Sequence, residues 1–131
     1  MRLLLDTHIA LWSVMQHPRL PAAARNLIED SANEIHVSAV SLWEIAIKFT
    51  AKRGDLRLVP MSARDAERWF LTAGYTLLDM TPAHAVAVED LPPHHGDPFD
   101  RMLVAQALTE PLRLVTADEA LRPYSDTVVV V

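Results

Sequence analysis

The chain has 131 residues, of which half are hydrophobic, contains no cysteine and carries a formal net charge of −5. This length predicts one domain over residues 1–131, and the lack of cysteine excludes disulfide bonds, thiolate metal sites and cysteine nucleophiles. The negative charge argues against a protein that coats nucleic acid through basic side chains. Asp6 and His8 interrupt the first apolar run, and no apolar run approaches roughly 18 residues. We therefore expect neither a signal peptide nor a membrane span, and we expect a cytoplasmic location.

Strand and helix signals alternate along the chain, which predicts an α/β fold. The expected strands lie at residues 2–6, 35–38, 75–78, 113–116 and 127–131. The expected helices lie at residues 8–15, from Pro21 with packing residues up to Ile28, at 41–53 with a stop at Gly54, at 62–73 with a stop at Gly74, from Thr81 to Val88, at 99–108 and at 119–122. Residues 91–98 are rich in proline and have no regular period, which indicates a loop.

Two aspartates follow apolar runs that have the pattern of buried strands. Asp6 follows residues 1–5, and Asp118 follows residues 112–117. If these two strands are parallel neighbours, both carboxylates emerge at the carboxyl edge of the sheet, where α/β proteins place their sites.

Two further acids, Glu44 and Asp100, open the two most strongly helical stretches of the chain. Four carboxylates in one cleft would repel one another, so such a cluster is stable when it is protonated, paired with cations or bound to a metal. Without cysteine or an evident set of nitrogen ligands, clustered carboxylates favour a hard cation such as Mg²⁺ or Mn²⁺.

Each acid also has a structural interpretation when it is taken alone. Asp6 and Asp118 can cap the helices that follow them. Glu44 completes a capping-box pattern with Ser41 and can also pair with Lys48 one turn later.

The same holds around the helix at 99–108. Asp97 precedes a proline and fits a turn, while Asp100 fits the first helical turn, where the helix dipole favours negative charge. Arg101 can serve either as a local ion partner or as a phosphate contact.

The adjacent His94 and His95, with Asp97 close by, form the competing pattern of a transition-metal site. Adjacent side chains in a Pro-Gly loop point in different directions, and no two histidines have HxxxH spacing, so this site is disfavoured. The glycine patterns of nucleophile elbows, P-loops and dinucleotide-binding folds are absent as well.

Taken together, the acids and their neighbours resemble a PIN-domain protein, specifically a VapC-type ribonuclease toxin of toxin–antitoxin systems. The similarity covers the whole chain. It rests on four motifs in the order of the family: LLLDTH at 3–8, SAVSLWEIAIK at 38–48, DPFDRMLVAQA at 97–107 and LVTAD at 114–118.

This resemblance implies a three-layer α/β/α sandwich around a central, mainly parallel sheet. It also implies that the catalytic acids are Asp6, Glu44, Asp100 and Asp118. Asp6 and Asp100 would be the direct ligands of one or two Mg²⁺ or Mn²⁺ ions, and the other two acids would complete the shell or orient the attacking water.

Three neighbouring residues are auxiliary candidates under the same resemblance. Asp97 is an extra acid that could support or replace Asp100, although the spacing to the residues that follow favours Asp100. Thr116 matches a hydroxyl near the metals in the family. Arg101 is either a local ion partner or a phosphate contact, as above.

The implied reaction is endonucleolytic hydrolysis of RNA, and structured RNA such as tRNA is a common target in the family. The implied partners are a second copy of the chain in a homodimer and a VapB-like antitoxin, whose tail can place an arginine or lysine in the acidic pocket. We expect helices 8–15 and 41–53 to form part of the antitoxin groove, with Trp12 and Ile47 among the contacts. The alternative is a catalytically idle PIN-like domain that binds RNA or protein without cutting.

Overall fold

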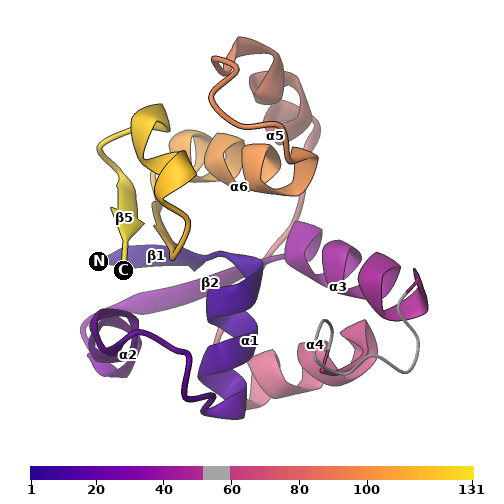
Figure 1. The fold of residues 1–131 in the computed structure, drawn as a ribbon, viewed down its shortest axis with the longest axis vertical. Helices are drawn as coiled ribbons and strands as arrows, with labels where there is room; N and C mark the ends of the chain where they lie inside the picture. The colour runs from indigo at the N-terminus through magenta and orange to yellow at the C-terminus, as the bar shows by residue number, and fades with distance from the viewer. Residues whose placement is uncertain (52–59) are drawn as a thin grey trace.

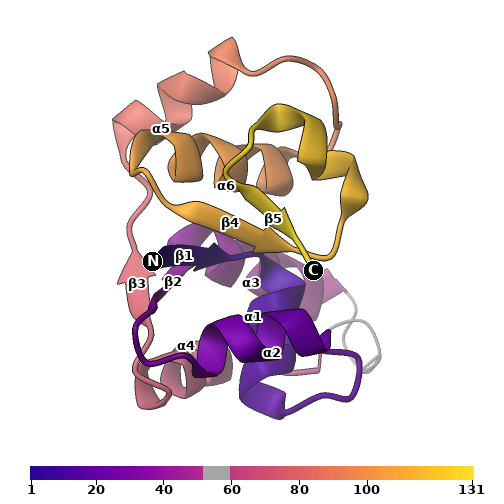
Figure 2. The same ribbon diagram turned by 90° about the vertical axis from the view of Figure 1, so that its left-hand side faces the viewer.

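The computed structural model describes residues 1–51 and 60–131 of the chain. Within these residues, five parallel strands form one sheet in the order β3-β2-β1-β4-β5 (Figure 2). The strands are β1 (Arg2–Leu5), β2 (Glu34–Ser38), β3 (Thr76–Leu78), β4 (Arg113–Thr116) and β5 (Val128–Val130). An all-parallel sheet needs crossover connections, and helices supply them here.

Helices cover both faces of the sheet, which gives the three-layer sandwich that the resemblance to PIN domains implies (Figure 1). The helices are α1 (Thr7–Met15), α2 (Ala22–Glu29), α3 (Ala39–Ala51), α4 (Ala63–Thr72), α5 (Pro82–Ala87) and α6 (Pro98–Thr109), with short 3₁₀ turns η1 (Val88–Asp90) and η2 (Glu119–Tyr124). α1, α2 and α4 lie on one side of the sheet, α5 and α6 lie on the other, and α3 leaves the end of β2.

The alternation of side chains along β1 divides the core between the two faces. Leu3 and Leu5 pack into the cluster formed with α1, α2 and α4, while Leu4 packs into the cluster formed with α6. All three are fully buried. This explains why the first strand is a continuous apolar run rather than an alternating one, since both of its faces are covered.

The strand order reverses between β1 and β4, because the chain first builds outward through β2 and β3 and then returns to the other side of β1. Leu5 of β1 is in register with Val115 of β4. This confirms that the two apolar runs are parallel neighbours. In open α/β sheets, the crevice beyond the carboxyl ends of the strands at such a reversal is where ligands bind, and Asp6 and Asp118 lie there.

Most predicted boundaries agree with the structure, with one difference that affects the site. α3 begins at Ala39, directly after β2, rather than at Ser41. The predicted stop at Gly54 lies outside the described residues. Gly74 follows α4 with φ +84°, the left-handed conformation expected of a glycine that ends a helix.

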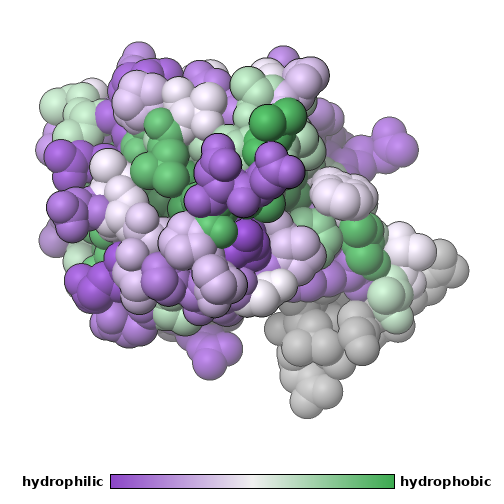
Figure 3. Space-filling view, turned by 90° about the horizontal axis from the view of Figure 1, so that it is seen from above, coloured by the Kyte–Doolittle hydropathy of each residue, from purple (hydrophilic) through white to green (hydrophobic). Residues whose placement is uncertain are grey.

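The surface over α5 and α6 mixes apolar patches with polar side chains (Figure 3). Val86 and Leu108 are among the large apolar residues exposed in these helices. None of the helices in the described ranges is both long enough and apolar enough to cross a membrane.

Candidate active site

Asp6 is held between the end of β1 and the start of α1. Its Oδ1 accepts a hydrogen bond from the backbone N–H of Ile9 at 2.9 Å, which confirms the predicted helix cap, and its Oδ2 accepts one from Thr116 Oγ1 at 2.5 Å. Burial raises the pKa of Asp6, and the negative charge of Glu44 adds to the rise, against the hydrogen bonds from Thr116 and Ile9. The carboxylate is therefore costly to ionise without a nearby cation.

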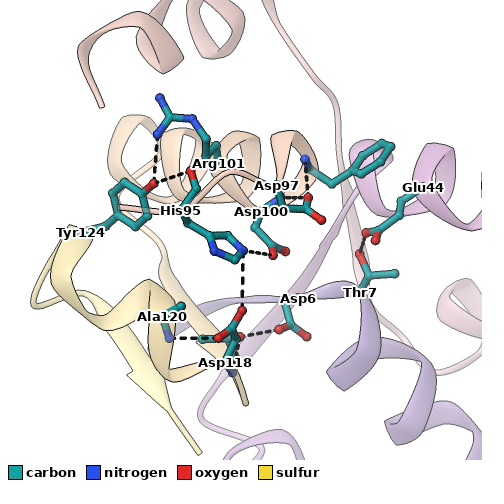
Figure 4. A network of polar contacts seen from close by, with 12 residues as sticks. Asp6, Thr7, Glu44, His95, Asp97, Asp100, Arg101, Asp118, Ala120 and Tyr124 are labelled. Atoms are coloured by element: carbon teal, nitrogen blue, oxygen red, sulfur yellow. Dashed lines mark hydrogen bonds and ion pairs between the residues drawn. The ribbon is translucent and has the colours of Figure 1, made fainter. Parts of the chain in front are cut away.

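Thr116 links the two strand ends that carry aspartates. This fully buried residue donates to Asp6 and accepts the backbone N–H of Asp118 at 3.0 Å on the same oxygen. Asp118 Oδ1 accepts the N–H of Ala120 at 2.9 Å, which confirms Asp118 as the cap of η2. Its other carboxylate oxygen is turned toward the cluster (Figure 4).

The N-terminus of α6 brings in the next two acids. Asp97 is the helix cap, with Oδ1 accepting the N–H groups of Phe99 at 2.8 Å and Asp100 at 3.1 Å. Asp100, one turn along, directs its carboxylate toward Asp118 and His95 (Figure 4). The geometry thus gives Asp97 the supporting position and Asp100 the inward one.

The charge environment of Asp100 is unusual. The pKa of Asp100 is raised to about 6, first by burial and also by the negative charges of Asp97, Asp6 and Glu44, while the hydrogen bond from His95 opposes the rise. Carboxylates from three different elements therefore act together on Asp100, and protonation or a bound cation would relieve their repulsion.

Glu44 does not have the capping role that its sequence pattern suggests. Because α3 begins at Ala39, Ser41 lies inside the helix, and the capping-box interpretation is wrong. Instead, Glu44 Oε1 accepts a hydrogen bond from Thr7 Oγ1 at 2.6 Å, and Oε2 pairs with Lys48 Nζ at 2.6 Å, as predicted for that pair. Glu44 is 4% exposed, and its carboxylate stands at the α3 side of the cluster (Figure 4).

Arg101 points away from the acids (Figure 4). Its Nη1 donates to the carbonyl of Pro92 and to Tyr124 Oη, both at 2.9 Å. The guanidinium therefore ties the loop of residues 91–97 to η2, and it is not the ion partner of Asp100.

His95 lies beside Asp100 and Asp118, although its sequence pattern disfavours a metal site built from His94, His95 and Asp97. Its Nε2 lies 3.0 Å from Asp100 Oδ2 and 3.7 Å from Asp118 Oδ2. His94 turns elsewhere and packs edge-on against Tyr124 with ring centroids 5.1 Å apart, so the two histidines do point in different directions, as expected. The sequence carried a signal for this position of His95, because a histidine two residues before the helix cap Asp97 can reach the first turn of the helix.

A cavity of about 480 Å³ adjoins the cluster along α1. Asp6 and Asp118 line its acidic end, and Trp12 and Met15 line its apolar part. Any extended molecule that reaches the carboxylates along this path therefore passes over the exposed side of α1.

The PIN domain model matches residues 3–126 of the chain. This chain belongs to the PIN-domain family. Ribonuclease VapC22 of Mycobacterium tuberculosis is 35% identical over 124 residues, which cover 92% of this PIN domain and 90% of that protein. At this identity and coverage, the chain also belongs with the VapC-type members of the family.

Solved structures share the fold of this PIN domain. A chain from the complex of VapBC2 from Rickettsia felis with a promoter DNA fragment has a TM-score of 0.68 at 16% identity, over 100% of this chain and 98% of that one. A chain of DNA-bound VapBC from Salmonella typhimurium has a TM-score of 0.68 at 15% identity, over 100% and 97%. FitAcB from Neisseria gonorrhoeae has a TM-score of 0.61 at 16% identity, over 98% and 96%.

Proposed function

We propose that this single PIN domain is a metal-dependent endoribonuclease that acts as the toxin of a VapBC-type toxin–antitoxin pair and hydrolyses RNA phosphodiester bonds in the cytoplasm. The observation that carries the proposal is the gathering of Asp6, Asp100 and Asp118 beyond the carboxyl ends of β1 and β4. The 35% identity to a ribonuclease supports the same activity.

The donor set fits a divalent cation. Asp6 and Asp100 both have a raised pKa that is due first to burial and then in part to neighbouring negative charge, and a bound cation would relieve both causes. Carboxylate oxygens are the ligands that Mg²⁺ and Mn²⁺ prefer. We assign Asp6 and Asp100 as direct ligands, with Glu44 and Asp118 completing the shell.

When bound, such an ion would neutralise charge on the scissile phosphate and lower the pKa of a water molecule. The protein's part is to orient the acids, whose ionisation is then favoured by the bound positive charge. Thr116 fixes one oxygen of Asp6, and Thr7 with Lys48 fixes both oxygens of Glu44, which is then placed to orient the attacking water.

The experiment that tests this proposal is RNA cleavage by the purified chain with Mg²⁺, with Mn²⁺ and with chelator, beside Asp6→Asn. Asp126→Asn is a matched control, because Asp126 is an exposed carboxylate outside the cluster. Cleavage should require a cation and Asp6, and the control should cut like the wild type. Folded protein that binds RNA but cuts under none of these conditions would favour the idle PIN-like alternative, and cleavage that survives both chelator and Asp6→Asn would refute the metal mechanism.

A VapB-like antitoxin is the proposed regulator, supported by the fold shared with chains of VapBC complexes. An arginine or lysine from its tail would supply positive charge to the acid cluster in place of a metal. We propose that α1 and α3 form part of the groove for that tail. Trp12 lines the cavity beside Asp6, and Ile47 is 42% exposed on α3.

We propose in addition that the toxin is a homodimer and that its substrate is a structured RNA such as tRNA. Light scattering of the purified chain tests the first statement, with a mass of twice 14.6 kDa as the expected result. Sequencing of the cleavage ends from total RNA tests the second, and ends concentrated in tRNA are the expected outcome.

A further inference from the structure

One nitrogen ligand enters a site that is otherwise built from carboxylates. The Nε2 atom of His95 and one carboxylate oxygen each from Asp100 and Asp118 all lie within 4.8 Å of one another. His95 and Asp100 are each about a quarter exposed, so the group faces the open side of the cluster rather than the core.

The backbone around His95 is fixed from two sides. Tyr124 Oη donates to the His95 carbonyl at 3.4 Å, and Arg101 holds the same loop through the Pro92 carbonyl. The cap formed by Asp97 then anchors the loop to α6. The backbone that carries His95 is therefore held independently of the imidazole, and the contact of Nε2 with Asp100 at 3.0 Å orients the ring toward the acids.

We propose that His95 Nε2 is a direct ligand of the catalytic divalent cation, together with the carboxylates of Asp100 and Asp118. This inference rests on the proposed function and adds a ligand to its metal site. Around an octahedral ion with bonds of about 2.1 Å, neighbouring ligand atoms lie about 3.0 Å apart and opposite ones about 4.2 Å apart. The separations of 3.0 and 3.7 Å from Nε2 to the two carboxylates fall within that range.

The nitrogen ligand changes which metal the site selects. Mg²⁺ is bound through oxygen ligands and keeps several of its waters, whereas imidazole suits transition metals better. His95 therefore favours Mn²⁺ over Mg²⁺ at a site where carboxylates alone would discriminate less. His95, a loop residue, would thus set the metal preference of the proposed nuclease.

The test is pulsed electron paramagnetic resonance of the Mn²⁺-loaded full chain, with calorimetric titration of Mn²⁺ and Mg²⁺ alone. The variants are His95→Ala and His95→Gln, with His94→Ala as the matched control from the adjacent position. The wild type and the control should show the coupling of a directly bound ¹⁴N nucleus, and both His95 variants should lose it. Mn²⁺ should bind His95→Ala about 10-fold to 100-fold more weakly, while the Mg²⁺ affinity should change much less.

The outcomes separate this inference from the proposed function. Mn²⁺ that binds the wild type, requires Asp100 and shows no ¹⁴N coupling would overturn the role of His95 and leave the carboxylate site standing. Equal losses of Mn²⁺ and Mg²⁺ affinity in both His95 variants would also overturn it, because His95 would then only hold Asp100 in place. A wild-type chain that binds neither ion would contradict the proposed function itself.

Discussion

Thr116 Oγ1 donates a hydrogen bond to Asp6 Oδ2 at 2.5 Å, across 110 positions of sequence. The bond is possible because β1 and β4 are parallel neighbours that end at the same level, with Leu5 in register with Val115. The same hydroxyl oxygen accepts the N–H of Asp118, so one side chain sets the position of two acids. Two ligands of the proposed site are thus positioned by the sheet rather than by a flexible loop.

Replacement of Thr116 by valine should impair cleavage without removing any carboxylate. The substitution keeps the shape of the side chain but leaves Asp6 and the Asp118 N–H each short of one hydrogen bond in a buried setting. We expect a loss of about 1–3 kcal/mol in the free energy of unfolding and a fall in cleavage rate on the order of 10-fold to 100-fold. Denaturant unfolding and single-turnover cleavage measure the two effects.

Thr116→Ser is the matched control, because it keeps the hydroxyl and removes only a methyl group. It should cut at close to the wild-type rate. If the valine variant cuts as fast as the serine variant, the hydroxyl does not orient Asp6 for the reaction.

The metal-free fold should be less stable at neutral pH than in acid because of Asp100. Its pKa is 3.8 in the ordinary state and about 6 in the fold, so folding favours the protonated form. This contribution is fully present below about pH 4 and is lost as the pH rises through about 6, and the loss amounts to about 1–3 kcal/mol. Asp100→Asn, which carries no charge, should therefore be more stable than the wild type above pH 6 and should lose this advantage near pH 4.

Urea unfolding in chelator across pH 4–8 measures this difference. Asp126→Asn, in which an exposed carboxylate is replaced, serves as the control and should track the wild type at every pH. A stability difference between Asp100→Asn and the wild type that does not vary with pH would contradict the electrostatic explanation.

Addition and removal of metal should move the melting temperature of the wild type. A ligand that binds only the folded state at 100 times its dissociation constant adds about 2.7 kcal/mol to the free energy of unfolding. Mn²⁺ or Mg²⁺ should therefore raise the melting temperature, and chelator should reverse the rise. Asp100→Asn should respond weakly and Asp126→Asn fully; equal responses in all three proteins would point to binding outside the cluster.

The sequence was sufficient to predict the sheet and the acids that follow its strands. Asp6 and Asp118 follow continuous apolar runs, and such runs are typical of strands covered on both faces. The partners of Glu44 could not be predicted, because its contact with Thr7 depends on how α1 and α3 cross and on a helix start two residues earlier than its pattern indicated. The position of His95 beside Asp100 and Asp118 could not be predicted for a similar reason, since its loop is held by Arg101 and Tyr124 through tertiary contacts.

Charged substitutions in the proposed antitoxin groove should weaken the complex without unfolding the toxin. Trp12 lines the cavity that opens from Asp6 but is half-buried and packs against the core, whereas Ile47 is exposed on α3, so Ile47→Glu is the substitution that disturbs the fold less. In the complex, either glutamate would be buried at the interface; at position 12 it would lie in the cavity that Asp6 lines, beside Arg19, whose guanidinium is 5.9 Å from the Trp12 ring. We expect the dissociation constant of the antitoxin to rise about tenfold or more, as measured by calorimetry.

Leu108→Glu tests specificity, because Leu108 is 45% exposed on α6 in the opposite layer, and this variant should bind like the wild type. Unchanged affinity in folded Trp12→Glu and Ile47→Glu proteins would exclude the face formed by α1 and α3 as the antitoxin site.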